Sequence, residues 1–270
     1  MRGGDVRMPV KTGATEIPPR HPGATGGLQM DDSSKRYLRQ IGVVGQDGQA
    51  SLGKARVLIA GAGGLGCVTA TYLALAGVGM LRIVDRDRVE PTNLNRQFLH
   101  CEADLGRPKA DSAAERLRCW NPGIHVETVD RTIDEDSIGD IADGIDLVID
   151  AADNFALRRI LNLAAITRNI PFIHGAVKGF YGQAMTVLPG KSACYQCLFP
   201  SQMEGDPPAV LGATCGVIGA IQASEAVKYL TGRGKLLSGR LLIWDGENAD
   251  MDTVAVERTP SCPACGNLSR

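Results

Sequence analysis

The sequence predicts an α/β fold of the Rossmann type, with a mostly parallel sheet that helices cover on both faces. Between residues 55 and 175, short apolar runs alternate with amphipathic helical patterns, which is typical of parallel strands buried on both faces. The first run leads directly into a glycine-rich turn, Gly61-Ala62-Gly63-Gly64-Leu65-Gly66, which opens a helix. That order of strand, glycine turn and helix is the nucleotide-binding start of a Rossmann sheet.

The elements follow from the same patterns in chain order. Buried strands are expected at 57–60, 81–85, 126–129, 146–150 and 171–174, with helices ending near residue 76, running from 109 to 120, and from 154 to 168. After residue 180 the pattern changes to a strand at 183–188, a long loop at 189–214, a helix at 216–230, and antiparallel strands at 241–244 and 253–256. The sheet should therefore continue into antiparallel C-terminal strands.

The N-terminal segment differs from the rest of the chain. Residues 1–30 are rich in glycine and proline and have no apolar periodicity, so we expect a disordered extension before one domain at 31–270. Met30 stands immediately before a segment that resembles a helix start. Initiation at Met30 is the alternative, in which case residues 1–29 are not translated.

Composition narrows the function classes. The chain has 270 residues, a net charge of -1 and only 4% aromatic residues, which does not suggest a nucleic-acid surface. No apolar run approaches the roughly 18 residues of a membrane span, and no apolar segment follows the basic N-terminus as in a secretory signal. A cytoplasmic protein with reduced cysteines is therefore expected.

The glycine turn indicates a nucleotide site. Glycines let the backbone approach a phosphate at the N-terminus of a helix. Asp85 lies 19 residues after Gly66, at the end of the next strand, where a carboxylate can accept hydrogen bonds from both ribose hydroxyls. These features predict a nucleotide but do not distinguish NAD from ATP.

The polar segment after Asp85 favours ATP. It contains Arg96, and Lys109 follows at the start of the next helix. Two cations suit a triphosphate, whereas the diphosphate of a dinucleotide has no evident need for them. An NAD-dependent oxidoreductase remains the alternative for the glycine turn taken alone, and a non-catalytic scaffold is disfavoured by the full set of polar residues.

Several motifs occur together in one order, and with them the chain from about residue 35 to 267 resembles the MoeB/ThiF/HesA family, relatives of ubiquitin-activating enzymes. Each motif is modest by itself, and the ordered set is specific. The matching segments are Arg36-Tyr37-Leu38-Arg39-Gln40, the glycine turn, Asp85 with Asn93-Leu94-Asn95-Arg96-Gln97, Gly106-x-Pro108-Lys109, Asp150-x-x-Asp153-Asn154, Gly216-Val217-Ile218-Gly219 with Gln222-Ala223-x-Glu225-Ala226, and two Cys-x-x-Cys pairs.

The resemblance implies an adenylyltransferase that uses Mg-ATP to attach AMP to a C-terminal Gly-Gly carboxylate. The implied partner is a ubiquitin-like sulfur-carrier protein of the MoaD or ThiS kind, and the implied assembly is a homodimer. The nucleotide-binding half would span about 55–175, and the carrier-binding and zinc-containing half about 176–267. By the same resemblance, Gly61, Gly63, Gly64, Gly66 and Gln97 would line the nucleotide site, Asp85 would hold the ribose, Asn93, Arg96 and Lys109 the phosphates, Asp153 the Mg²⁺ with Asn154 beside it, and Arg39 would enter the partner's site.

Four cysteines form the candidate metal site. Cys194-x-x-Cys197 and Cys262-x-x-Cys265 supply four thiolates, a set that favours structural Zn²⁺ in tetrahedral coordination. The distance between the pairs along the chain exceeds that of a compact zinc ribbon, so separately buried thiols are the competing interpretation. A zinc ion here would tie the long loop to the C-terminus.

One departure from the family leaves the substrate open. Many relatives have a reactive cysteine in the long loop, whereas this chain has none at 204–209. Cys215 is the remaining loop candidate, since it stands at the expected start of a helix whose dipole lowers a thiol pKa. A plain helix-start residue is the preferred interpretation. Adenylation of a different carboxylate, such as a small peptide, is the main alternative function.

Overall fold

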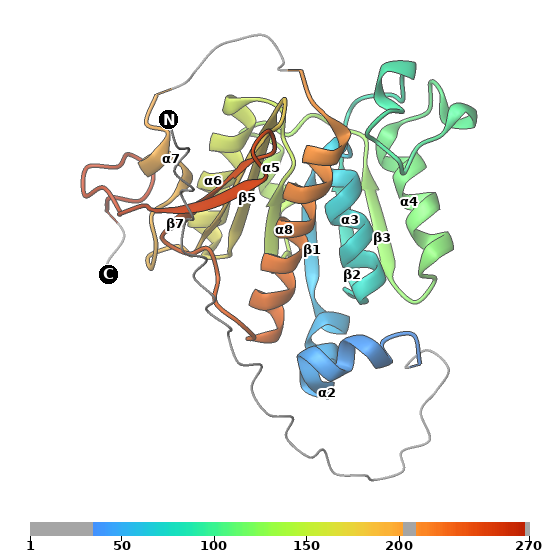
Figure 1. Cartoon of the computed structure of the whole chain (residues 1–270), viewed down its shortest axis with the longest axis horizontal. Helices are drawn as coiled ribbons and strands as arrows, with labels where there is room; N and C mark the ends of the chain where they lie inside the picture. Colours follow the sequence, from blue (N-terminus) through green and yellow to red (C-terminus); the bar gives the residue numbers. More distant parts are fainter. Residues whose placement is uncertain (1–34, 202–208, 268–270) are drawn as a thin grey trace, which may run out of the picture.

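The computed structural model describes residues 35–201 and 209–267. An eight-stranded sheet in the order β3-β2-β1-β4-β5-β6-β7-β8 forms its centre (Figure 1). The predicted extension at 1–30, the alternative initiator Met30 and the stretch 204–208 lie outside the described residues.

The first five strands are parallel, and the last three add in antiparallel pairs. Within the parallel part, Val57 of β1 pairs with Leu81 of β2 on one side and Leu147 of β4 on the other. This confirms the predicted fold class. The strands are β1 (Arg56–Ala60), β2 (Met80–Val84), β3 (His125–Val129), β4 (Leu147–Asp150), β5 (Phe172–Lys178), β6 (Tyr181–Val187), β7 (Arg240–Asp245) and β8 (Asp250–Ala255).

Helices cover both faces of the sheet. On one face, α3, α4 and α8 bury the side chains of Ile59 and Ile83 in a core with Leu73 and Leu117. On the other face, α5, α6 and α7 pack against alternate strand residues such as Val148. The helices are α2 (Leu38–Lys54), α3 (Gly64–Ala76), α4 (Lys109–Trp120), α5 (Ile138–Ile141), α6 (Phe155–Arg168), α7 (Tyr195–Leu198) and α8 (Gly212–Thr231), with short 3-10 turns η1 (Pro91–Asn93) and η2 (Glu102–Asp104).

The expected loop at 189–214 was partly wrong. It contains α7, and α8 begins at Gly212 rather than at residue 216. The N–H of Cys215 donates to Leu211 O at 3.2 Å, and the hydroxyl of Thr214 donates to Gly179 O at 2.9 Å. Gly179 lies in the β5–β6 turn, far from Thr214 in the sequence. The residues around 212 therefore gave no indication that the helix begins there.

Helix α2 precedes β1 and lies at the end of the sheet from which the parallel strands start (Figure 1). Its Gln40 and Gln49 side chains both donate to Ala76 O, at 2.9 and 3.0 Å. These bonds fix α2 to the C-terminal end of α3. None of the helices in the described part of the chain is long and apolar enough to cross a membrane.

Candidate nucleotide site and cysteine cluster

The predicted glycine turn lies where the chain leaves β1, between β2 on one side and β4 on the other. From β1 the chain continues to β2 and β3 on one side of the sheet, whereas β4 and β5 lie on the other side. Open α/β sheets bind ligands at such a switch point. A Cβ at Gly61 would lie 2.7 Å from Ala151 O, and the φ of Gly61 is 109°. Only glycine suits both conditions, so the turn packs directly on the loop that follows β4.

The same turn brings the start of α3 close to the strand end. A Cβ at Gly66 would lie 1.9 Å from Gly61 O, so any side chain there would force the helix away. Gly63 is the N-cap of α3, and no side chain caps the helix. Its first N–H groups are therefore available to an anion, as phosphate sites at helix N-termini require.

Asp85 follows β2 and contacts the glycine turn. Its Oδ2 accepts from Ala62 N at 2.7 Å, and its Oδ1 accepts from Asp87 N at 2.8 Å. Burial raises the pKa of the Asp85 carboxyl, and the two backbone N–H groups oppose that rise. Each oxygen keeps a lone pair, so the carboxylate beside the turn can still accept from a ribose hydroxyl.

Asn93 ends η1, and Arg96 and Gln97 lie on the segment that follows it. Arg96 Cδ would lie 3.6 Å from a Cβ at Gly64, so its side chain runs past the glycine turn. Within the described residues no carboxylate pairs with Arg96, and its guanidinium donates to Thr92 O at 2.9 Å. Asn93 is buried and its Oδ1 accepts from Glu90 N at 3.0 Å. Asn93 thus holds the turn itself.

Gln97 carries a polar atom that lacks a partner. The residue is 4% exposed, and its Oε1 is buried without a hydrogen bond. Its Nε2 would lie 3.8 Å from a Cβ at Gly63, so the amide borders the glycine turn. An unsatisfied buried acceptor costs free energy, and a ligand donor at this position would remove that cost.

Lys109 begins α4 and is 7% exposed. Its Nζ lies 2.9 Å from Asp87 Oδ2, so the ammonium pairs with a carboxylate just beyond Asp85. Asp87 was not among the predicted site residues. Asp87 stands two residues after Asp85 and on the same polar segment as Arg96. That position could have indicated that it lies close to the site.

Asp153 and Asn154 occupy the loop between β4 and α6. Asn154 is the N-cap of α6 and accepts from Leu157 N at 2.9 Å, while its Nδ2 donates to Asp153 Oδ1 at 3.0 Å. Asp153 is exposed, and among residues 35–201 and 209–267 no cation pairs with it. A free carboxylate of this kind fits a Mg²⁺ that keeps most of its waters.

Among the residues predicted for the nucleotide site, the fold keeps Arg39 away from the glycine turn. It is exposed on α2, next to Gln40, whose side chain bonds Ala76 O at the far end of α3. Since α3 has 13 residues, Gly64 lies about 20 Å from that end. Arg39 therefore lies outside the site of its own chain.

The four predicted cysteines come together on the α6 face of the sheet. Their sulfur atoms all lie within 4.8 Å of one another. Cys194 Sγ is 3.9 Å from Cys197 Sγ and 3.6 Å from Cys262 Sγ, and Cys197 Sγ is 3.5 Å from Cys265 Sγ. A disulfide needs about 2.05 Å, whereas ligands at about 2.3 Å from a tetrahedral metal are about 3.8 Å apart. The cluster therefore fits a metal.

The thiols of this cluster differ in their pKa, and a glycine shapes the turn beside them. Burial raises the pKa of the Cys194 thiol. Burial acts the same way on Cys197, but its pKa is lowered to about 7, chiefly because Thr259 N donates to its Sγ at 3.4 Å. A Cβ at Gly266 would lie 2.4 Å from Pro260 O, so only glycine allows the tight turn after Cys265.

Cys215 differs from the expectation based on the helix dipole. It lies inside α8 rather than before it, and it is 1% exposed. Burial raises the pKa of its thiol, and Arg96 only partly opposes the rise. A Cβ at Gly64 would lie 2.7 Å from Cys215 Sγ. The thiol thus packs on the glycine turn and is not activated.

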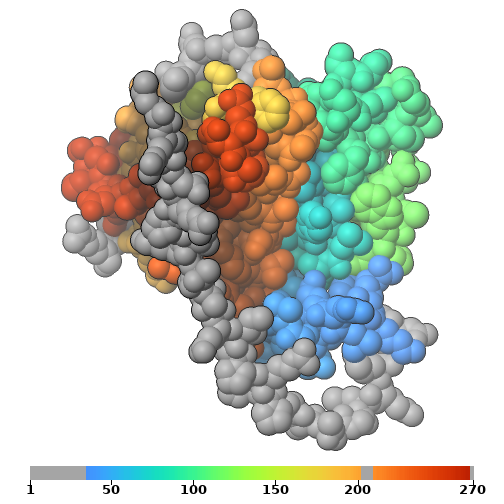
Figure 2. All heavy atoms as spheres, in the orientation of Figure 1, coloured from blue at the N-terminus to red at the C-terminus, as the bar shows by residue number. Residues whose placement is uncertain are grey.

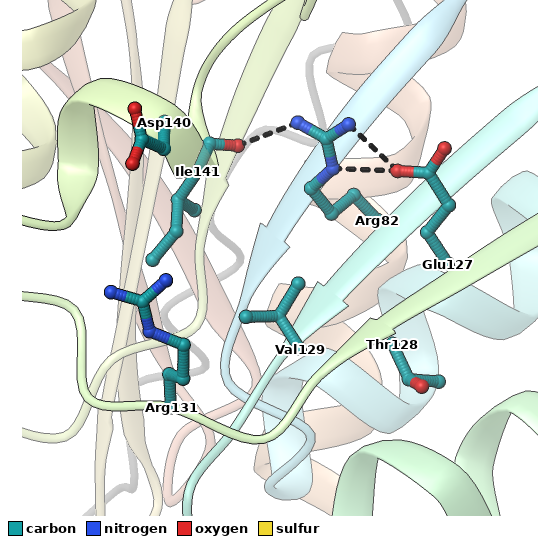
Figure 3. A pocket seen from close by; sticks show the side chains of 7 residues that line it. All are labelled: Arg82, Glu127, Thr128, Val129, Arg131, Asp140 and Ile141. Atoms are coloured by element: carbon teal, nitrogen blue, oxygen red, sulfur yellow. Dashed lines mark hydrogen bonds and ion pairs between the residues drawn. The ribbon is translucent and has the colours of Figure 1, made fainter.

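A separate cavity of about 350 Å³ lies beside β2 and β3 and contains none of the predicted site residues (Figure 3). Arg82 is its central cation. Arg82 Nε donates to Glu127 Oε2 at 2.7 Å, and its Nη1 donates to Ile141 O at 2.8 Å (Figure 3). The Arg82 guanidinium is therefore engaged within the protein and is not free to bind an anion.

Comparison with known proteins places these features in a family. Residues 37–264 match the model of the ThiF family. The SAMP-activating enzyme E1 of Haloferax volcanii is 45% identical over 239 residues, which cover 86% of this chain and 88% of that protein. The sulfur carrier protein adenylyltransferase of Thermus thermophilus is 40% identical over 245 residues, covering 86% and 90%.

Another similar protein is the ThiS adenylyltransferase of Escherichia coli, which is 37% identical over 243 residues and covers 87% of this chain and 96% of its own. Among solved structures, E. coli MccB with ATP matches with a TM-score of 0.77 at 25% identity, covering 86% of this chain and 75% of that one. The chain belongs to the ThiF family.

Proposed function

We propose that this protein is an ATP-dependent adenylyltransferase that activates the C-terminal Gly-Gly carboxylate of a ubiquitin-like sulfur-carrier protein. The observation that carries the proposal is the packing of the glycine turn on the loop that leads to Asp153, with Gly61 against Ala151 O. Nucleotide and carboxylate-held metal would meet there, at the switch point of the sheet. Relatives at 37–45% identity carry names of this activity.

The chemistry suits these residue types. A carboxylate attacks the α-phosphate, an acyl-phosphate bond forms, and the bond to pyrophosphate breaks. The nucleophile is already ionised, so alignment and charge stabilisation supply most of the catalysis. Arg96 beside Gly64 and Lys109 released from Asp87 are the two cations for the phosphates. Asp85 would hold the ribose, and the orphan Oε1 of Gln97 would gain a donor.

Two metals fit the donor sets. Asp153 is an exposed carboxylate with no ion-pair partner in the described part of the chain, and it would hold Mg²⁺. The metal would neutralise charge on the phosphates. The Cys194, Cys197, Cys262 and Cys265 thiolates would hold Zn²⁺. Four protein ligands leave no open position, so this zinc is structural.

A homodimer accounts for Arg39. The side chain is exposed on α2, and its neighbour Gln40 bonds Ala76 O at the end of α3 that lies about 20 Å from the glycine turn. In a symmetric dimer it would enter the partner's site as an additional cation. The domain from 31 to 270 would then form two sites per dimer, each with one residue from the other chain.

The half at about 176–267 is the proposed carrier-binding part. Its β7–β8 hairpin stands exposed beside α8 (Figure 2), and Met251 and Val254 are about half exposed there. The MccB structures match at lower identity, 24–26%, than the sulfur-carrier relatives. We therefore favour a carrier protein over another carboxylate.

ATP–pyrophosphate exchange tests the function. Radiolabelled pyrophosphate should enter ATP only when a carrier protein ending in Gly-Gly is present with Mg²⁺. A carrier lacking its last two glycines is the matched control and should give no exchange. Pyrophosphate exchange that does not depend on the carrier protein, or that occurs with a short peptide in its place, would contradict the proposed substrate.

A further inference from the structure

A buried polar cluster lies behind the Asp153 loop and plays no part in the chemistry above. Asp150 is the last residue of β4, and its carboxylate is fully buried, with 0% of the residue exposed. Its Oδ2 accepts from His174 Nδ1 at 2.6 Å and lies 3.4 Å from Arg158 Nε. A carboxylate this deep in a protein is costly unless it is paired and hydrogen-bonded, and these two side chains are its partners.

The cluster holds both backbone groups of Ala152. Asp150 Oδ1 accepts from Ala152 N at 3.0 Å, and Arg158 Nη2 donates to Ala152 O at 2.7 Å. Ala152 immediately precedes Asp153, whose other neighbour, Asn154, is fixed as the N-cap of α6. The backbone of Asp153 is therefore fixed on both sides, although its carboxylate is exposed.

His174 orients the Asp150 carboxylate. Gln183 Nε2 lies 3.1 Å from His174 Nε2, and since an amide NH₂ only donates, His174 Nε2 accepts. The proton then sits on Nδ1 and points at Asp150. Complete burial lowers the pKa of His174 against the effect of Asp150, which agrees with a neutral ring. The ring is packed 5.0 Å from that of Tyr195, centroid to centroid.

We infer that Asp150, Arg158 and His174 are positioning residues for the metal at Asp153, because they fix the backbone of Ala152 from within the core. This inference rests on the proposed function. None of the three touches the substrate. They act through the loop, as the groups behind a metal ligand do when they orient it.

Two arginines on α6 make a matched pair for the test. Arg158 Nη2 bonds Ala152 O at 2.7 Å, and Arg168 Nη2 bonds Gly139 O at 2.6 Å. Binding of Mn²⁺, with the ATP analogue AMPCPP, is measured by electron paramagnetic resonance. Arg158→Met should weaken Mn²⁺ binding by about 10- to 100-fold. Arg168→Met loses one arginine–carbonyl bond in the same helix and should bind as the wild type does.

His174 gives a second, independent pair. His174→Leu removes the donor to Asp150, and Mn²⁺ affinity should fall by about tenfold. His174→Asn places an amide donor near the position of Nδ1 and should restore affinity to within about threefold of the wild type. A role in packing alone predicts the opposite order, since leucine suits an apolar pocket better than asparagine.

The outcomes separate the two hypotheses. Failure of the wild type to bind Mn²⁺ and AMPCPP together would overturn the proposed function. Normal binding by the wild type with equal affinities for Arg158→Met and Arg168→Met would overturn the inference alone. If Arg158→Met shows no cooperative melting transition, the Mn²⁺ affinities of the two His174 variants decide. A higher affinity for His174→Asn than for His174→Leu supports the positioning role. An affinity of His174→Leu equal to or above that of His174→Asn contradicts it.

Discussion

Lys109 and Asp87 form an ion pair of 2.9 Å, in which the lysine is buried and the aspartate is exposed. The pair couples the start of α4 to the segment after β2, and Lys109 N also donates to Asp87 O at 2.9 Å. An exposed aspartate can be solvated without its partner, whereas a buried ammonium needs a counter-charge. We therefore propose that Lys109 exchanges Asp87 for a phosphate when ATP binds.

Replacement of this lysine should impair chemistry more than folding. Lys109→Met removes one positioned cation, and we expect pyrophosphate exchange to fall by roughly 10²- to 10³-fold, with a small change in melting temperature. Arg107→Met is the control, because Arg107 is an ion-paired, more exposed cation two residues earlier. Equal loss in both variants would show that Lys109 contributes only to the general charge of the loop.

The sequence was sufficient for the features that depend on local pattern. The glycine turn needs Gly61 and Gly66 for reasons visible in the backbone, and alternating apolar runs marked each strand of the parallel sheet. The Asp87–Lys109 pair and the Asp150–His174 bond join residues 22 and 24 positions apart. Such contacts depend on which strands become neighbours, and no local pattern specifies them. The early start of α8 was missed for the same reason.

Cys215 should not act as a nucleophile. Burial raises the pKa of its thiol, so at pH 7 it stays protonated, and its sulfur packs on Gly64. Cys215→Ala should keep pyrophosphate exchange within about twofold of the wild type, since a neutral substitution touches no cation or metal ligand. In the native protein, iodoacetamide should modify the exposed Cys101 and Cys119 well before Cys215, as peptide mass spectrometry can show. A thioester trapped on Cys215 would contradict this.

The cysteine cluster should hold one zinc ion per chain and contribute stability rather than rate. Cys262→Ser removes one ligand and should lose about 3 kcal/mol, which for a chain of this size lowers the melting temperature by about 5–10 °C. The folded fraction should retain its exchange rate. Cys119→Ser changes an exposed cysteine outside the cluster and should keep both the zinc and the melting temperature. Protein purified without chelator but free of zinc by elemental analysis would refute the assignment.

Arg39 should act across the dimer interface. Within its own chain it is exposed on α2, which is bonded to the end of α3 about 20 Å from Gly64. Arg39→Ala should reduce pyrophosphate exchange by roughly 10²- to 10³-fold, the usual cost of one positioned cation, while circular dichroism stays unchanged. Asp153→Ala should lose exchange to a similar extent, through loss of the metal.

Mixing the two inactive variants distinguishes action between chains from action within one. In a hybrid dimer, one subunit supplies Asp153 and the other supplies Arg39, so one of the two sites is complete. Random exchange makes about half of the dimers hybrid, and the activity should recover to about a quarter of the wild-type value per site. If mass spectrometry confirms subunit exchange and no activity returns, Arg39 serves its own chain or the subunits associate through another surface. Recovery near a quarter would instead require each site to be built from two chains.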